Sequence, residues 1–176
     1  MASVGPQDRP RSSNVVALGV TSFLTDVSSE ITLTLLPLFL LGLLGGKTAL
    51  IGLIEGVAEF TATLLKFFSG WFSDRLGRRK VLALLGYGLS ALSKPFLYFA
   101  ASWEAVLGIR FADRFGKGVR TAPRDALVAD SADKDHQGRA FGLHRALDTA
   151  GAVWGTGIAA IVIYLSQYQA LALAPS

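Results

Sequence analysis

The 176-residue sequence contains no cysteine, one methionine and only two histidines. Without cysteine the chain can form no disulfide bond and offers no thiolate ligand to a metal ion. The two histidines, His136 and His144, match no zinc-binding spacing. The sequence therefore excludes a disulfide-stabilised fold and predicts neither a metal site nor another cofactor.

Charged side chains are also scarce. Asp, Glu, Lys and Arg make up 17% of the residues, against about 25% in a soluble domain. Hydrophobic residues make up 51%, so the composition predicts a membrane protein. The net charge of +4 is typical of the Lys and Arg in cytoplasmic loops of membrane proteins, and we expect no nucleic-acid partner. No short apolar segment with a small-residue cleavage site follows the N-terminus, so we expect no cleaved signal peptide.

Five long apolar segments follow a polar N-terminus, residues 1–13, which we expect to be disordered. Each segment reaches the roughly 20 residues that a membrane-spanning helix needs, and the backbone must satisfy its own hydrogen bonds in lipid. The sequence therefore predicts an all-α membrane bundle over residues 14–165, with 166–176 as a truncated tail. The predicted spans are residues 14–41, 48–71, 81–101, 104–130 and 138–164.

Short connections between the segments force consecutive helices to run antiparallel. The loop DRLGRRK at residues 74–80 is strongly basic, and the positive-inside rule places such a loop in the cytoplasm. We therefore expect a multi-pass protein of the cell membrane with a cytoplasmic N-terminus.

The fourth segment, residues 104–130, carries a high density of charge. At 100° per residue its charged side chains fall within one arc of about 140°, and a loop would not sort them in this way. A charge within the bilayer costs at least a few kcal/mol, so this face must meet protein or a water-filled cavity. We predict a spanning helix with one wet face that presents Arg110, Asp113, Arg114, Lys117, Arg120, Arg124 and Asp125.

The other segments supply acidic partners at helical spacing. Glu55 lies at the depth of Arg110, and Glu59 at the depth of Arg114. The third segment offers only Lys94 and is predicted to be an outer, lipid-facing helix. Some of these charges could simply hold the bundle together; the alternative is a solute and proton pathway. The candidate pathway residues are Asp26, Glu30, Glu55, Glu59, Arg110, Asp113, Arg114, Lys117, Arg120, His144, Arg145 and Asp148.

The stretch GWFSDRLGRRK, residues 70–80, resembles the signature loop between the second and third helices of the major facilitator superfamily. The family pattern is G-x-x-x-D-[RK]-x-G-R-[RK]. In the family this loop locks the outward-facing state, so the resemblance implies a conformational gate, with Asp130 as the acidic partner at the end of the fourth helix. The matching residues are Gly70, Asp74, Arg75, Gly77, Arg78 and Arg79.

Two further patterns bear on the solute. Arg110 and Gly116 resemble the family pattern R-x-x-q-G-x-G in the fourth helix, but Arg114 stands where the family usually has glycine. This extra charge favours an anionic or zwitterionic solute; multidrug efflux is the alternative. Gly151 and Gly155 resemble the antiporter motif G-x-x-x-G-P without its proline, and we interpret them as a helix-packing pair.

The stretches TDVSSEITLTLLPLFLLG and TAPRDALVAD resemble a subgroup of bacterial and archaeal members of this superfamily. The resemblance implies a secondary transporter rather than an enzyme, which moves a small solute by alternating access and is usually driven by protons. Asp26 or Glu30, both carboxylates at mid-depth, is predicted to carry the proton. The complete family fold has twelve helices in two halves, so we expect these residues to be the N-terminal half, which requires a C-terminal half.

Two other classes of function remain to be weighed. A membrane-embedded phosphoalcohol transferase would need a dense D-G-x-x-A-R…G-x-x-x-D-x-x-x-D array, which the sequence lacks. A non-transporting membrane scaffold could keep the fold, although buried paired charges argue against it.

Overall fold

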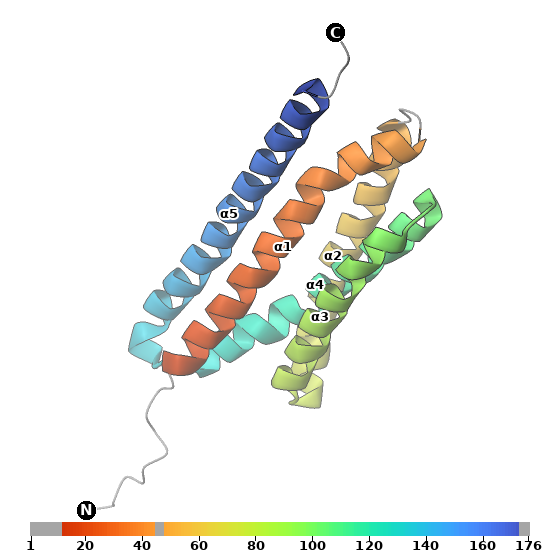
Figure 1. Cartoon of the computed structure of the whole chain (residues 1–176). Helices are drawn as coiled ribbons and strands as arrows, with labels where there is room; N and C mark the ends of the chain where they lie inside the picture. Colours follow the sequence, from red (N-terminus) through yellow and green to blue (C-terminus); the bar gives the residue numbers. More distant parts are fainter. Residues whose placement is uncertain (1–11, 45–47, 173–176) are drawn as a thin grey trace, which may run out of the picture.

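The computed structural model describes residues 12–44 and 48–172, and those residues form helices joined by short connections, with no strand among them. This confirms the predicted all-α bundle. Of the N-terminus expected to be disordered, residues 1–11 lie outside the described residues. In chain order the elements are α1 (Ser12–Leu44), α2 (Thr48–Leu76), α3 (Arg79–Ser93), η1 (Lys94–Phe99), α4 (Trp103–Asp130), η2 (Lys134–His136) and α5 (Gln137–Ala172) (Figure 1).

Three helix ends differ from the sequence prediction. Helix α2 continues to Leu76, so the first residues of the basic loop are helical. The third span is not one continuous α-helix: α3 ends at Ser93 and the 3-10 turn η1 follows. Pro95 lacks the N–H group that would continue the α-helical hydrogen bonds at this point. At the C-terminal end, residues 166–172 continue α5 rather than forming a tail, and 173–176 lie outside the described residues.

Four described helices are long and apolar enough to cross a membrane, within residues 14–42, 48–76, 79–99 and 137–167. Helix α4 is not among them because its charges lower its hydropathy, although its 28 residues are enough for a span of roughly 42 Å at 1.5 Å per residue. That α4 spans the bilayer with its charges turned toward protein stays a prediction.

The helices pack as two groups. Helix α1 lies along α5, and α4 lies between α2 and α3 (Figure 1). Glycines allow the first contact: a Cβ on Gly151 would lie 2.6 Å from the Phe23 carbonyl oxygen, and one on Gly155 would lie 2.6 Å from that of Val27. The predicted packing role of these two glycines is confirmed.

Helix α3 approaches α4 just as closely. A Cβ on Gly86 would lie 2.6 Å from the Gly116 carbonyl oxygen, and a Cβ on Gly116 would lie 2.6 Å from that of Gly86. One face of α3 is therefore buried against α4, while Leu84, Leu85 and Leu92 on its other face are exposed. The prediction of an outer, lipid-facing helix is wrong for the face of α3 that packs on α4; for the exposed face, contact with lipid stays a prediction.

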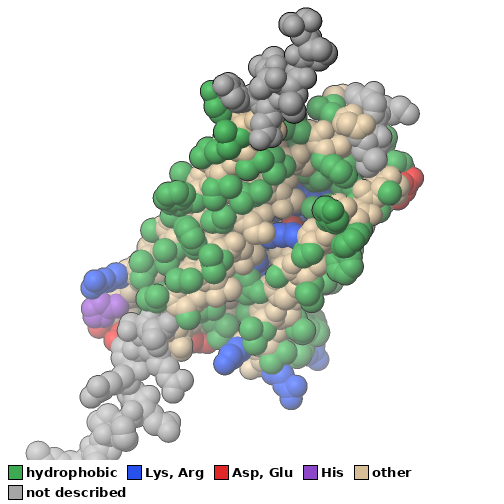
Figure 2. All heavy atoms as spheres, in the orientation of Figure 1, with side chains coloured by type: hydrophobic (Ala, Val, Ile, Leu, Met, Phe, Trp, Pro, Cys, Tyr) green, Lys and Arg blue, Asp and Glu red, His purple; other side chains and the backbone are tan. Residues whose placement is uncertain are grey.

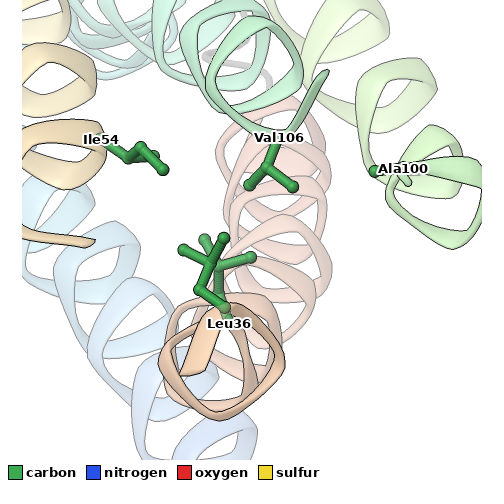
Figure 3. Close-up of a cluster of buried hydrophobic side chains, with 5 residues drawn as sticks. Leu36, Ile54, Ala100 and Val106 are labelled. Atoms are coloured by element: carbon green, nitrogen blue, oxygen red, sulfur yellow. The ribbon is translucent and has the colours of Figure 1, made fainter. Parts of the chain in front are cut away.

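Apolar contacts close both ends of the bundle. Near the end of α1, Leu36 and Leu40 pack with Ile54, Ala100 and Val106, and Figure 3 shows Leu36, Ile54 and Val106 pointing toward one another from three helices. At the opposite end, buried Val15, Val128 and Ala140 form a second cluster. Between these clusters the interior is polar. Figure 2 shows the outer face largely covered by hydrophobic side chains, with basic side chains visible in the hollow between α1 and α3.

Candidate functional site

A cavity of about 820 Å³ lies between α1, α2, α4 and α5. Its volume is in the range of small-molecule sites, but its walls are far more charged than those of an ordinary ligand pocket. Five acidic and five basic side chains line it, so its formal charge is balanced. These are Asp26, Glu30, Glu59, Asp125, Asp148, Lys66, Lys117, Arg120, Arg124 and Arg145.

Helix α4 supplies the central charges of the interior. Arg110 is 1% exposed and binds Glu55 of α2 through two hydrogen bonds, with Nε 2.9 Å from Oε1 and Nη2 2.7 Å from Oε2. Its Nη1 also donates to Asp113, 3.2 Å away. A planar guanidinium that meets a carboxylate edge-on forms the strongest and most directional kind of ion pair. This contact fixes the level of α2 against α4.

Three more pairs continue from Arg110 along α4. Arg114 Nη1 lies 3.6 Å from Glu59 Oε2 on α2. Arg120 Nη2 lies 3.7 Å from Asp26 Oδ1 on α1, and Arg124 Nη1 lies 3.6 Å from Asp148 Oδ2 on α5. We call these three pairs and Arg110–Glu55 the charge ladder. The matching of Glu55 with Arg110 and of Glu59 with Arg114 follows the depths predicted from the sequence.

A second network links α4 to α3 and α1 through Lys94. Ser90 donates a hydrogen bond to Asp113, and Lys94 Nζ lies 3.9 Å from the same carboxylate. Lys94 also donates to Ser29 Oγ at 3.0 Å and to the Thr25 carbonyl oxygen at 3.4 Å. Lys94 thus lies inside the bundle. Gly86 lies four residues before Ser90 and eight residues before Lys94, so the three residues share one face of the third span. This spacing is a signal that the sequence interpretation missed.

Tyr87 of α3 contacts both α1 and α4 in the interior of the bundle. The Arg120 guanidinium lies over the Tyr87 ring, 4.3 Å from its centroid, in a cation–π contact. The Tyr87 hydroxyl and Ser22 Oγ are 2.8 Å apart, and Arg124 Nη1 donates to the same Ser22 Oγ at 3.2 Å. Arg120 and Arg124 are therefore held by neutral groups as well as by carboxylates.

Two carboxyl groups meet at the cavity wall. Asp26 of α1 and Asp148 of α5 both line the cavity, and each pairs with an arginine of α4, Asp26 with Arg120 and Asp148 with Arg124. Two carboxylates that lie close together repel each other, and protonation of one of them removes the repulsion. Both carboxyl groups here face the basic side of α4 at the cavity wall.

The structure divides the predicted pathway residues into three sets. Glu55, Arg110 and Asp113 form ion pairs with one another beyond the cavity wall, and Arg114, also outside the lining, pairs with Glu59 of the wall. His144 is buried, 1% exposed, and is not part of the lining. Of the predicted residues, those that line the cavity are Asp26, Glu30, Glu59, Lys117, Arg120, Arg145 and Asp148.

The signature loop forms a separate site at the end of α2. Arg79 bridges two carboxylates: its Nη2 lies 3.0 Å from Asp74 Oδ1, and its Nη1 contacts Asp130 at the end of α4. Gly77 has a φ of 62° and donates its N–H to the Ser73 carbonyl oxygen at 3.1 Å. This left-handed cap ends α2 and favours glycine.

The other residues of the loop motif have more peripheral places. Arg75 lies 5.3 Å from the centroid of the Trp71 ring, and Arg78 is exposed. A Cβ on Gly70 would lie 3.5 Å from the Ala122 Cβ, in ordinary contact with α4. The contact of Asp130 with a basic loop residue is present as predicted, whereas the gating role of the motif stays a prediction.

Within residues 12–44 and 48–172, no group of three His, Cys, Asp or Glu side chains is arranged to hold a metal ion. The polar interior of the described chain contains ion pairs, hydroxyl groups and the buried His144. Such an arrangement can hold a charged solute and move a proton.

Comparison with known proteins adds a family match to this geometry. The model of the Major Facilitator Superfamily matches residues 18–176. A protein of Methanocaldococcus jannaschii named as an uncharacterised MFS-type transporter is 42% identical over 162 residues, which are 92% of this chain and 40% of that protein. No solved structure matches.

Two other relatives show the same partial coverage. An uncharacterised protein of Mycobacterium tuberculosis is 34% identical over 142 residues, 80% of this chain and 34% of that protein. The inner membrane metabolite transport protein YgcS of Escherichia coli is 29% identical over 115 residues, 65% of this chain and 23% of its own length. The chain thus spans less than half the length of these curated relatives.

Proposed function

The chain belongs to the Major Facilitator Superfamily, and on this premise we propose that it forms one helical bundle of a proton-coupled secondary transporter. The transporter moves a small anionic or zwitterionic solute across the cell membrane by alternating access. The observation that carries the proposal is the balanced set of ten charged side chains around a cavity of about 820 Å³.

The energetic argument rests on where these charges lie. Each charge placed in hydrocarbon costs at least a few kcal/mol, and a bundle built only for stability would replace ion pairs by well-packed apolar side chains at little or no cost. A cavity wall that keeps ten charges is better explained by a charged solute that must enter and leave. The name of the Escherichia coli relative, a metabolite transport protein, supports a small solute of this kind.

Proton coupling is assigned to the carboxyl pair of Asp26 and Asp148. Asp26 also faces Arg120 at 3.7 Å, so a shift of that guanidinium toward a solute changes how readily the pair holds a proton. Binding of an anionic group near Arg120 would therefore favour proton uptake by Asp26. This links solute binding to protonation at one site.

The bundle is proposed to work with a second bundle. The charged cavity wall would face lipid if nothing covered it, at a cost of several kcal/mol per charge, and transporters of this kind bind the solute between two repeats. Arg79, which ties Asp74 to Asp130, would then govern opening at the proposed cytoplasmic end. The N-terminus is assigned to the cytoplasm because the loop at 74–80 is basic.

The experiment is solute uptake into proteoliposomes that contain the chain together with a complementing C-terminal bundle, with and without a pH gradient. We expect gradient-driven uptake of carboxylate or zwitterionic solutes. Asp26→Asn should abolish the gradient-driven component and spare solute exchange, because an amide cannot release a proton. Normal gradient-driven uptake in this variant would refute the coupling role, and a preference for lipophilic cations would point instead to multidrug efflux.

The bundle alone is expected to be inactive. Proteoliposomes that contain only the 176-residue chain should show no gradient-driven flux, because nothing completes the cavity wall. Clear flux from the purified monomer would contradict the need for a second bundle.

A further inference from the structure

The charge ladder sets the level of α1 against α4. Ser22 contacts Arg124 and Asp26 contacts Arg120, so residue numbers rise along α1 as they fall along α4 and the two helices are antiparallel. Glu30 lies four residues beyond Asp26, about 6 Å along the axis, and Lys117 lies three residues before Arg120, about 4.5 Å along the axis. Glu30 and Lys117 are therefore at nearly the same level on two walls of one cavity.

Glu30 and Lys117 lie between members of the charge ladder but are not part of it. Glu30 and Lys117 both line the cavity. Yet within the part of the chain that the structure describes, neither forms an ion pair within 4.0 Å, whereas the pairs above and below them on α4, at Arg114 and Arg120, are formed. The ladder thus has one open step along α4, bounded by a carboxylate on α1 and an ammonium group on α4; Lys66 of α2, which is exposed, is the one other lining charge without an ion pair among the described residues.

An open step of this kind selects for a particular charge pattern. The cavity lining is balanced, so a solute with net charge would leave an uncompensated charge in a low-dielectric interior. A zwitterion brings one group for each side: its anionic group pairs with Lys117 and its cationic group pairs with Glu30. Hydrogen bonds to charged groups contribute about 1.5–3 kcal/mol each, so loss of one contact lowers affinity by roughly 10-fold or more.

We propose that Glu30 and Lys117 form the solute-binding site of the cavity. The solute is a small zwitterion that carries a carboxylate and an ammonium group. This inference rests on the proposed transport function and narrows its solute class. Glu30 then binds solute and does not carry the coupled proton, which leaves that role to the Asp26–Asp148 pair.

The test is a titration of the chain, reconstituted in nanodiscs together with a complementing C-terminal bundle, with ω-amino acids of two to six carbons. Two analogues of each are matched in size: an alkanoate in which a methyl group replaces the ammonium group, and an ω-amino amide that lacks the carboxylate. We expect at least one ω-amino acid to bind roughly 10-fold or more tightly than both of its analogues. Equal or tighter binding of the alkanoate or of inorganic phosphate would overturn the zwitterion assignment, and so would a folded chain that binds no member of the series.

Variants assign the two ends of the solute. In Lys117→Gln the ω-amino acid should bind no better than its amide, and in Glu30→Gln no better than its alkanoate. The double variant Glu30→Lys with Lys117→Glu restores both charges and should regain the preference for the zwitterion. The controls Glu104→Gln and Lys80→Gln alter exposed side chains outside the cavity lining and should leave the preference unchanged.

Failure of this inference is separable from failure of the transport function. Unchanged preferences in both single variants, with circular dichroism showing that they fold, would overturn the assignment of Glu30 and Lys117 even if uptake is observed. Selective binding that depends on both residues, together with no flux in proteoliposomes that contain both bundles, would keep the binding site and refute transport.

Discussion

Replacement of Arg110 by methionine is expected to destabilise the bundle more than any other single change to the charge ladder. The side chain of Arg110 is 1% exposed and serves two carboxylates, Glu55 and Asp113. Its removal leaves Asp113, 4% exposed, with Ser90 and a lysine 3.9 Å away. Breaking a buried ion pair by removing one partner costs about 3–5 kcal/mol of unfolding free energy.

The reciprocal change should cost less. In Glu55→Gln, Arg110 keeps its contact with Asp113 and the glutamine oxygen still accepts a hydrogen bond, so we expect a loss of about 1–2 kcal/mol. Arg145→Met is the matched control, because Arg145 is 61% exposed and its ion pairs are 4.0 Å long. Ion pairs of this exposed kind contribute about 0–1 kcal/mol.

The assay is reversible unfolding in mixed detergent micelles, followed by the fluorescence of the three tryptophans. A double-mutant cycle with Arg110→Met and Glu55→Gln should give a coupling free energy above about 1 kcal/mol, as expected of residues in contact. Equal stability of Arg110→Met and Arg145→Met, or strict additivity in the cycle, would refute the view that the ladder holds α2 against α4.

Three further predictions concern packing, gating and topology. Gly86→Val should lower the free energy of unfolding by about 1–3 kcal/mol because the new side chain meets the backbone of α4. Gly88→Val, with no atom within 4 Å of its Cβ position, should cause no such loss. Equal melting temperatures of the two variants would contradict this prediction. Arg79→Gln should speed hydrogen exchange at residues 74–80, because it releases the two carboxylates that Arg79 bridges, and unchanged exchange would argue against the bridge. Single cysteines at Ser102 and Lys134 should react with impermeant reagents only from outside and only from inside, respectively, and the reverse pattern would overturn the orientation.

The sequence was sufficient to predict the helices and the wet face of α4. Five segments of spanning length, four of them apolar, specify five long helices, and the 3.6-residue period alone gathers the charges of α4 on one side. Depth along each helix then matched Glu55 with Arg110. These features depend on the geometry of single helices, which follows directly from the spacing of residues in the sequence.

The rotation of α3 could not be predicted in the same way. Because Lys94 is the single charge of the third segment, the sequence predicts an outer, lipid-facing helix. The close approach of Gly86 to Gly116 turns the edge that carries Ser90 and Lys94 inward, and this is a contact between residues 30 positions apart in the sequence. The open step at Glu30 and Lys117 was equally inaccessible, because it depends on which neighbouring charges are already paired.

The most direct test of the account is whether the cavity between α1, α2, α4 and α5 is wet when the chain is in a membrane. Because the sequence contains no cysteine, single substitutions provide clean probes. Thr63→Cys places a thiol on the cavity wall, and Leu84→Cys places one on the exposed apolar face of α3. A water-soluble thiol reagent should label Thr63→Cys, should be slowed there by the bound solute, and should leave Leu84→Cys unmodified. Labelling of Leu84→Cys with protection of Thr63→Cys in the absence of solute would contradict a charged solute pathway through this bundle.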